Sequence, residues 1–409
     1  MWNVSITGAT LSGNKGAAAM LRSVLKTLPP LIGEVGFSVL SVYPDDDARL
    51  NDDDRVEIVP ARPAVLIGAV PLAMAWAVLR WLHLSPGLMR CSPLLAALER
   101  SDLLIDLSGI SFTDGRVVEL VYNIVCILPA LFLGKKVIKC SQAMGPFETA
   151  PNRWAARALL PKVTLNVARG QRTLTYLREL GLENIALCAD VAFALPERES
   201  KETKKALRSL NRFGGRHIVG IAASSVVQTY CERRGIDYPQ AVAGLVDRLT
   251  ETGYGVWLIA HAVRKSRKHS QHSRSSDAET CQAVYDLLMD SQYCQLIVED
   301  YSPATLRAII GECSFFVASR FHAMVSSLVE GVPTIVTGWS HKYVEVLEMF
   351  DLGEWVIGHR ELSTVALWEK FQAMTTHQDE IREKIARHRD KVVASARRNA
   401  ELAASLLDP

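Results

Sequence analysis

The chain has 409 residues, of which 49% are hydrophobic and 22% charged, and its formal net charge is +2. This length predicts about two or three domains, and the composition is typical of a globular protein with large buried cores. A net charge so close to zero argues against a protein that holds nucleic acid by bulk electrostatics. The eight cysteines form no C-x-x-C pair, and the sequence begins directly with a strand pattern. We therefore expect no metal site, no nucleic-acid partner and a cytoplasmic location.

The sequence opens with a predicted strand over residues 3–6, a glycine-rich turn and a helix over residues 17–28. The turn reads TGATLSGNKG over residues 7–16. Its glycines let the backbone approach a ligand closely, and the start of the helix offers N–H groups to an anion or a sugar hydroxyl. The turn matches neither the dinucleotide-binding pattern nor the phosphate-loop pattern. Asn14 is its candidate ligand residue.

Two apolar stretches have helical length. Residues 63–79 carry no charge, but a glycine and an internal proline interrupt them, and they are short for a membrane span. Two interpretations stay open for this stretch: a buried or domain-packing helix, or an interfacial segment over residues 63–82 with Trp76 and Trp81 at a membrane surface. The second stretch, residues 117–133, is interpreted as a core helix.

Polar candidates stand at the ends of other strands in the first half. These strands are predicted over residues 35–42, 103–106, 136–140, 165–168 and 185–188. Asp106, Gln142 and Arg169 follow or end three of them, at the edge of a parallel sheet where ligands collect. Asp106 could act as a general base or hold a hydroxyl, or it could cap its own loop. Asp190 is either a hinge or cap or a ligand, and the acidic residues 45–54 are expected to form a solvated turn.

A charged segment over residues 196–213 reads as a linker, so we place a domain boundary there. The predicted organisation is a first domain over residues 1–197, a second over 198–372 and a helical tail over 373–409. In the second domain, His261 follows a strand over residues 255–260. The loop over residues 263–274 is strongly basic, and it is either a solvated loop or an electrostatic guide or lid for an anionic ligand.

The most informative stretch runs over residues 315–342. An apolar strand, 315–318, is followed by Ser319, Arg320 and His322 where a helix begins. Arg320 could bind a carboxylate or phosphate through two hydrogen bonds, and His322 could donate or accept a proton near neutral pH. Lys342 is expected in the loop after the next strand, 334–337, on the same sheet edge. The geometry alone also allows a cap or a surface ion pair.

Several motifs together resemble the polysaccharide pyruvyl transferase family. The matching segments are SRFHAMVSSLVEGVPTIVTGWSHK over residues 319–342, QAMGP over 142–146, the run from Arg169 to Leu195, and NKG over 14–16. Ala17 stands where the family usually has Asp. The resemblance implies two Rossmann-like α/β domains facing across a cleft, as in GT-B glycosyltransferases, with a C-terminal helix.

The resemblance also implies an activity: transfer of a pyruvyl group from phosphoenolpyruvate to two hydroxyls of one sugar, with release of phosphate. Phosphoenolpyruvate is then a co-substrate and no cofactor is needed. The acceptor is a sugar or a lipid-linked saccharide. His322 and Asp106 are the implied catalytic residues. The implied donor ligands are Arg320, Phe321, His322, Arg169, Lys342 and His261, and the implied acceptor ligands are Asn14 and Gln142.

Two other functions stay open at this stage. A nucleotide-sugar glycosyltransferase of the same architecture could use Glu330, which stands before a Gly-Val-Pro turn. A non-catalytic scaffold of a polysaccharide synthesis complex could attach to the inner face of a membrane through residues 63–82. The acceptor sugar, the pair of hydroxyls and the oligomeric state are not determined by the sequence.

Overall fold

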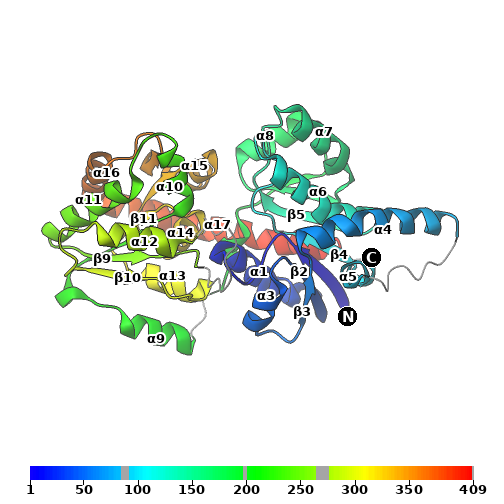
Figure 1. The fold of residues 1–409 in the computed structure, drawn as a ribbon, viewed down its shortest axis with the longest axis horizontal. Coiled ribbons are helices and arrows are strands. Elements are labelled where there is room, and N and C mark those ends of the chain that lie inside the picture. The colour runs from blue at the N-terminus through cyan, green and yellow to red at the C-terminus, as the bar shows by residue number, and fades with distance from the viewer. Residues whose placement is uncertain (84–91, 197–199, 264–275, 408–409) are drawn as a thin grey trace. The chain divides into compact units, whose positions relative to one another are not determined.

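A computed structural model describes residues 1–83, 92–196, 200–263 and 276–407. The chain divides into two compact units, which are described separately below. The first unit comprises Met1–Ser12, Ala17–Leu195 and Ala394–Pro409, and the second comprises Gly13–Gly16 and Pro196–Val393. Each unit contains one sheet whose paired strands are all parallel, with helices around it (Figure 1). The α/β fold predicted from the sequence is therefore confirmed.

The first unit has a seven-stranded sheet in the order β3-β2-β1-β4-β5-β6-β7. The strands are β1 (Trp2–Thr7), β2 (Val35–Ser41), β3 (Val56–Pro60), β4 (Leu103–Asp106), β5 (Lys136–Gln142), β6 (Leu165–Ala168) and β7 (Ile185–Leu187). The helices are α1 (Lys15–Thr27), α2 (Pro29–Ile32), α3 (Pro44–Leu50), α4 (Pro63–Trp81), α5 (Pro93–Arg100), α6 (Val117–Phe132), α7 (Ala150–Leu159) and α8 (Gln171–Glu179). The direction of strand addition reverses between β1 and β4, which makes this the topological switch point of the sheet.

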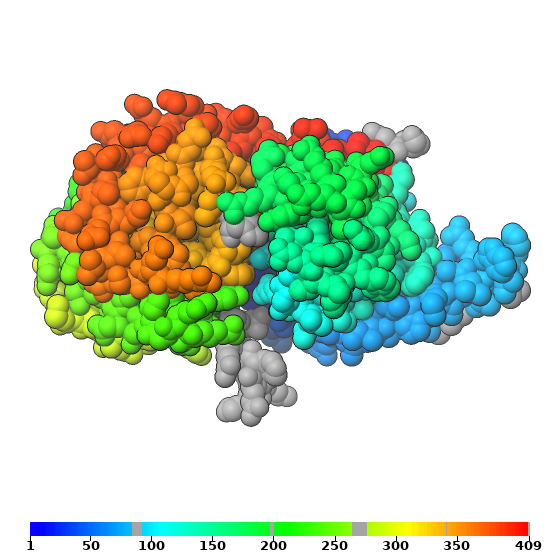
Figure 2. Space-filling view, turned by 90° about the horizontal axis from the view of Figure 1, so that it is seen from above, coloured from blue at the N-terminus to red at the C-terminus, as the bar shows by residue number. Residues whose placement is uncertain are grey.

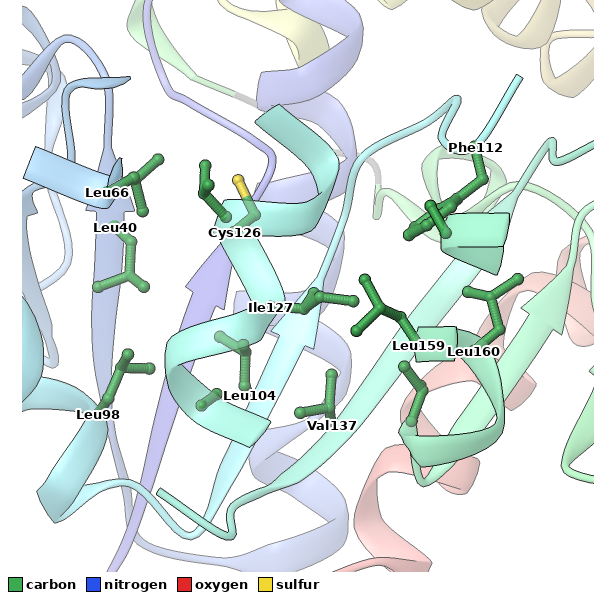
Figure 3. Close-up of a cluster of buried hydrophobic side chains, with 14 of the residues drawn as sticks. Leu40, Leu66, Leu98, Leu104, Phe112, Cys126, Ile127, Val137, Leu159 and Leu160 are labelled. Carbon is green, nitrogen blue, oxygen red and sulfur yellow. The ribbon is translucent and has the colours of Figure 1, made fainter. Parts of the chain in front are cut away.

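The core of the first unit lies between its sheet and α6. Figure 3 shows Leu104 of β4, Val137 of β5 and Ile127 of α6 in one cluster of buried side chains. β4 is an unbroken apolar run before Asp106 and is buried along its whole length, as expected for a central parallel strand covered on both faces. This burial holds the carboxyl end of β4, where the candidate residues stand, in one position.

The second unit has a six-stranded sheet in the order β10-β9-β8-β11-β12-β13. The strands are β8 (Ile218–Ala222), β9 (Gly255–Ile259), β10 (Cys294–Ile297), β11 (Phe315–Ala318), β12 (Thr334–Gly338) and β13 (Val356–Gly358). The helices are α9 (Lys201–Ser209), α10 (Ser225–Glu232), α11 (Tyr238–Glu251), α12 (Asp277–Asp286), α13 (Pro303–Gly311), α14 (Phe321–Val329), α15 (His341–Glu348), α16 (Thr364–Thr376) and α17 (Gln378–Ser405), of which the part from Ala394 onward belongs to the first unit. Its switch point lies between β8 and β11.

Three strands, β4, β6 and β11, have the boundaries predicted from the sequence. The acidic segment over residues 45–54 was wrongly interpreted as a solvated turn, because α3 occupies most of it. Asp47 of α3 is buried and accepts hydrogen bonds from Ser12 N (2.8 Å) and Ser41 Oγ (2.7 Å). The basic loop over residues 263–274 lies, except for Val263, outside the described residues.

The apolar stretch over residues 63–79 forms α4. Among the described residues, α4 is the one helix that is long and apolar enough to cross a membrane, by length and composition only, and 22% of its apolar window is buried. Its buried residues, Leu66, Ala69, Ala73 and Trp76, recur at helical spacing and join the core of the first unit. Only this stripe is buried, so α4 is not buried as a whole.

Candidate functional site

The candidate site of the second unit stands at its switch point. Ser225 follows β8, His261 follows β9, and Arg320 follows β11. The three strands are parallel neighbours in the sheet, so their carboxyl ends meet at one edge. Short apolar strands followed at once by polar residues produce this arrangement, because the strand is buried and the next residue emerges at the edge.

Arg320 is held by an acidic residue that the sequence analysis missed. Its Nε donates hydrogen bonds to both carboxylate oxygens of Asp277 (2.8 and 3.0 Å), its Nη2 donates to the same carboxylate, and Nη2 also donates to Ser225 Oγ (3.2 Å). The Asp277 side chain is fully buried, whereas the Arg320 side chain is 18% exposed. Asp277 therefore fixes the guanidinium plane while part of the group stays accessible to a ligand.

Three further basic groups lie near Arg320. Burial, followed by the charges of His322, Arg320 and Lys15, lowers the pKa of His261 to about 3. His261 is therefore a neutral imidazole near pH 7, which can both donate and accept a hydrogen bond. Lys15, which is almost fully buried, forms an ion pair with Asp300. Two of these basic groups, Arg320 and Lys15, already have acidic partners, and a bound anion would add a further favourable interaction with them.

The glycine-rich turn around Asn14 packs against this cluster, within the same compact unit. Asn14 Oδ1 accepts a hydrogen bond from Gly16 N (3.0 Å), and Asn14 forms an antiparallel bridge with Ala262, the residue after His261. A Cβ atom on Gly16 would lie 1.8 Å from Nδ1 of His322. Glycine is required here because the backbone of the turn touches the His322 ring.

A buried hydroxyl network holds the strand ends below the site. The hydroxyl of Tyr238 shares a hydrogen bond of 2.7 Å with Ser319 Oγ and accepts one from Ser224 N (3.2 Å). Ser319 Oγ also shares a hydrogen bond with Thr337 Oγ1. Burial raises the pKa of Tyr238, so its hydroxyl stays protonated. The network joins the ends of β8, β11 and β12 and makes Ser319 a positioning residue.

Lys342 is surrounded by aromatic rings. Its Nζ lies 4.7 Å from the ring centroid of Trp339, 5.1 Å from that of Tyr343 and 5.4 Å from that of Phe321. The prediction that Lys342 lies in a loop was wrong, because it belongs to the first turn of α15. Phe321 is buried, so its side chain supports Lys342 and its backbone starts α14. Such ring contacts stabilise an ammonium group by about 0.5–2 kcal/mol each.

The first unit contains a second cluster at its own switch point. Asp106 ends β4 and forms an ion pair with Lys139 of β5, and both side chains are fully buried. Burial by itself raises the pKa of Asp106, but Lys139 and the hydrogen bonds from Ser108 outweigh it, so that the pKa lies below its ordinary value. A Cβ atom on Gly8 would lie 2.3 Å from Ser108 Oγ. The two loops are thus packed tightly around an ionised carboxylate.

Gln142 and Arg169 are also engaged within the first unit. The Gln142 side chain is fully buried; its Nε2 donates to Asp106 O (2.8 Å) and its Oε1 accepts from Ser111 Oγ. Arg169 is 4% exposed and donates from Nη1 to Asp190 Oδ2 (2.9 Å). Asp190 Oδ1 also caps the next turn by accepting from Ala192 N (2.9 Å). The interpretation of Asp190 as a cap is therefore confirmed, and its role as a ligand stays a prediction.

The predicted residues fall into two groups. The second unit contains Arg320, His322, His261, Phe321, Lys342 and Asn14, and the first contains Asp106, Gln142 and Arg169. The sequence analysis missed Asp277, Lys15 and Lys139. A local signal existed for Asp277, which is an acidic residue at a helix start, but nothing local connects it with Arg320. Within the described ranges, no group of three or more His, Cys, Asp or Glu side chains is arranged to hold a metal ion.

Comparison with solved structures identifies the fold. A transferase from Siraitia grosvenorii, solved in complex with UDP, is 12% identical over 100% of both chains with a TM-score of 0.60. The UDP-GlcNAc 2-epimerase from Neisseria meningitidis, solved with UDP-GlcNAc, is 10% identical over 100% of this chain and 99% of its own, with a TM-score of 0.58. At these identities the likeness shows the fold alone, which is that of GT-B glycosyltransferases and related epimerases.

Comparison of the sequence identifies the family. No curated protein matches the chain. A family model for polysaccharide pyruvyl transferases matches residues 14–341, a range that begins in the turn around Asn14 and ends after the Ser-Arg-Phe-His motif. The match includes β4, β8 and β11 and covers well over half of the 409 residues. The chain therefore belongs to the polysaccharide pyruvyl transferase family.

Proposed function

We propose that this protein transfers the pyruvyl group of phosphoenolpyruvate to two hydroxyls of one sugar in a polysaccharide or glycolipid precursor. The observation that carries the proposal is the basic cluster at the switch point of the second unit, where Arg320, His322, His261 and Lys15 lie together. Phosphoenolpyruvate has about three negative charges near pH 7. It is a small anion that such a cluster can hold without a metal ion.

The donor binds at Arg320 and at the start of α14. The first turn of α14 contains no acidic residue, and Arg320 at the N-cap position places no side-chain cap on the helix. A helix N-terminus attracts phosphate and carboxylate groups. Hydrogen bonds between charged groups contribute about 1.5–3 kcal/mol each. The donor side of the second unit therefore comprises Arg320, the helix start with Phe321 and His322, and the neutral His261, with Lys342 as a further predicted contact.

The reaction begins with protonation of the methylene carbon of phosphoenolpyruvate, which makes its C2 electrophilic. One sugar hydroxyl attacks C2 and loses its proton, the bond from C2 to the phosphate oxygen breaks, and phosphate leaves with a proton. The second hydroxyl then attacks C2, loses its proton and closes the ketal ring. One proton is gained at carbon and one by phosphate, which balances the two lost by the hydroxyls. We assign the general acid that protonates the methylene carbon to His322. Its neighbour His261 is a neutral imidazole, which can donate or accept a hydrogen bond.

Each unit contains one residue that the resemblance assigns to the acceptor. Asn14, an exposed residue of the glycine-rich turn, is a predicted ligand of a sugar hydroxyl. Asp106 remains the predicted partner of the acceptor on the first unit, acting through the loop that it holds with Ser108 and Gln142, because its own carboxylate is buried against Lys139. Positioning of the two hydroxyls matters here because the ketal ring closes only when both reach C2.

The rival nucleotide-sugar reaction would rely on Glu330. This residue stands at the C-terminal end of α14, whereas Arg320 stands at its N-terminal end, and Glu330 Oε1 lies 4.0 Å from Arg307 Nε. The geometry therefore favours an anion at the start of α14 over a ribose at its end. The structures named above were solved with UDP or a UDP-sugar, so nucleotide sugars belong in the test.

Thermal unfolding with a panel of donors tests the proposal. Phosphoenolpyruvate at about one hundred times its Kd should stabilise the protein by about 2.7 kcal/mol, because it binds only the folded state, whereas UDP-sugars should have no effect. A panel of saccharides should then support phosphate release. Stabilisation by a UDP-sugar and not by phosphoenolpyruvate would support the glycosyltransferase, and the absence of turnover with any acceptor would support the scaffold.

We further propose that α4 contacts an anionic membrane surface and places the enzyme at the cytoplasmic face, where phosphoenolpyruvate is produced. In Figures 1 and 2, α4 extends beyond the rest of the first unit. The exposed apolar residues of α4 and the start of α6 are Val65, Ile67, Met74, Val78, Trp81, Leu82, Val117, Val118 and Val121. Neither Asp nor Glu occurs in α4, while Arg62, Arg80 and Arg116 flank the apolar face. Basic and aromatic residues around an apolar face are typical of interfacial helices.

Sedimentation with vesicles tests this contact. The triple variant Met74→Ser/Val78→Ser/Trp81→Ser should lose most binding to vesicles that contain anionic lipid, since each removes exposed apolar area that would enter the interface. Trp154, on α7 of the same unit, is 74% exposed, close to the 78% of Trp81. The Trp154→Ser control should bind like the original protein. Equal binding of all three proteins, or equal binding to neutral and anionic vesicles, would contradict the proposal.

A further inference from the structure

A cavity of the second unit is lined by residues other than those assigned to phosphoenolpyruvate, and one of its lining residues, Trp339, contacts Lys342. Its volume is about 420 Å³. It is formed by the C-terminal end of α10 and the residues that follow it, the residue after β12 and the residues after β13. Its lining residues are Tyr230, Arg233, Arg234, Trp339, His359 and Arg360. None of them is a proposed ligand of the donor.

The wall of this cavity is aromatic and ordered. The rings of Tyr230 and Trp339 stack with centroids 4.8 Å apart and an angle of 8° between their planes. The imidazole of His359 meets Tyr230 edge-on at 5.6 Å, and the guanidinium of Arg233 lies 5.6 Å from the Tyr230 ring centroid. These contacts orient Arg233 against a rigid surface, which reduces the entropy lost when it binds a ligand.

The charge of the cavity is uniformly positive. Three of its six lining residues are arginines and none is acidic. Within the part of the chain that the structure describes, Arg234 and Arg360 form no ion pair. Burial, followed by the charges of Arg360 and Arg234, lowers the pKa of His359. Two acidic residues are adjacent to lining arginines in sequence, Glu232 and Glu361, and Glu232 accepts a hydrogen bond from Gln228 (2.9 Å) on the surface of α10.

We infer that this cavity binds a pyrophosphate group, which on the proposed function is that of an activated saccharide acceptor. One carboxylate or phosphate group typically accepts paired hydrogen bonds from one or two arginine side chains. Three arginines around one cavity match an anion with two linked phosphates. The aromatic wall offers an apolar surface to the group attached to the pyrophosphate, whether a lipid chain or a nucleoside. The inference needs the proposed function only for the identity of the ligand, since binding is measurable without turnover.

Calorimetric titration with inorganic pyrophosphate tests the inference on the full chain. The variant Arg234→Gln/Arg360→Gln should bind pyrophosphate at least tenfold more weakly and should bind phosphoenolpyruvate as the original protein does. Farnesyl pyrophosphate and UDP-glucose distinguish the two sources of the group. Weakened binding of farnesyl pyrophosphate alone would indicate a lipid-linked ligand, and weakened binding of UDP-glucose alone a nucleotide-linked one.

The matched control removes two positive charges from another surface of the same unit. Lys205→Gln/Arg208→Gln changes two exposed residues of α9 and should leave pyrophosphate binding unchanged. Pyrophosphate binding that is equal in both variants would overturn the inference. Loss of phosphoenolpyruvate and pyrophosphate binding together in the Arg234→Gln/Arg360→Gln variant would also overturn it, since the cavity would then belong to the donor. Phosphoenolpyruvate could fail to stabilise the protein while the Arg234→Gln/Arg360→Gln variant still binds pyrophosphate more weakly. In that case the proposed function is wrong, but the pyrophosphate site in this cavity is supported.

Discussion

Replacement of Arg320 by Met is expected to weaken phosphoenolpyruvate binding about 10- to 150-fold, which corresponds to the loss of one hydrogen bond between charged groups worth about 1.5–3 kcal/mol. The same change should destabilise the protein by about 3–5 kcal/mol, because it leaves the fully buried carboxylate of Asp277 without its cation. Titration calorimetry measures the first effect and urea unfolding the second.

The double variant Arg320→Met/Asp277→Asn separates the two effects. The asparagine removes the buried charge and keeps an oxygen for Ser225 N, which donates to Asp277 over 3.1 Å. Stability should therefore largely return, whereas phosphoenolpyruvate binding should not. Arg307→Met is the control, because it removes another buried guanidinium of the same unit, beside Glu330, at the far end of α14. Recovery of donor binding in the double variant would show that Arg320 matters only for folding.

Replacement of Lys139 by Met should destabilise the first unit by about 3–5 kcal/mol, because Asp106 would keep a buried charge without a partner. The double variant Lys139→Met/Asp106→Asn should regain most of this loss, since neither side chain is then charged and the asparagine oxygen can still accept from Ser108 N, as Asp106 does at 2.8 Å. The exposed Lys162 is the control, and Lys162→Met should change stability by less than about 0.5 kcal/mol. Urea unfolding at neutral pH measures all three.

The same pair predicts how stability depends on pH. The folded-state pKa of Asp106 lies below its ordinary value, which is about 3.9 in an unfolded chain. Its contribution is therefore complete above pH about 4 and is lost as pH falls through the folded-state pKa. Urea unfolding between pH 2 and 7, as an acid series, should show a smaller loss of stability below about pH 4 for the double variant than for the original protein. Parallel curves for the two proteins would mean that Asp106 is not preferentially ionised in the folded state.

The sequence alone determined the features that depend on neighbouring residues. β4, β6 and β11 were predicted with their observed bounds because each is a short, mostly apolar run that ends at a polar residue, and burial on both faces allows no other pattern. The Ser-Arg-Phe-His motif after β11 was placed at the carboxyl end of its strand for the same reason, and its resemblance to the family's motif indicated the family that the family model confirms. The segment over residues 45–54 contained a local helix signal, Pro44 followed by acidic residues in the first turn, which its charge obscured.

Only the tertiary structure decided the partners of the charged residues. Asp277 is 43 positions before Arg320, and Lys139 is 33 positions after Asp106. Neither separation is a helical or strand repeat, so no local pattern predicts these pairs. They form because β4 pairs with β5, and because α12 begins near the residue that follows β11. Burying a charge destabilises the fold by several kcal/mol unless an opposite charge pairs with it. The order of the strands in the sheet determines which residue lies close enough to pair, and this order cannot be derived from local sequence patterns.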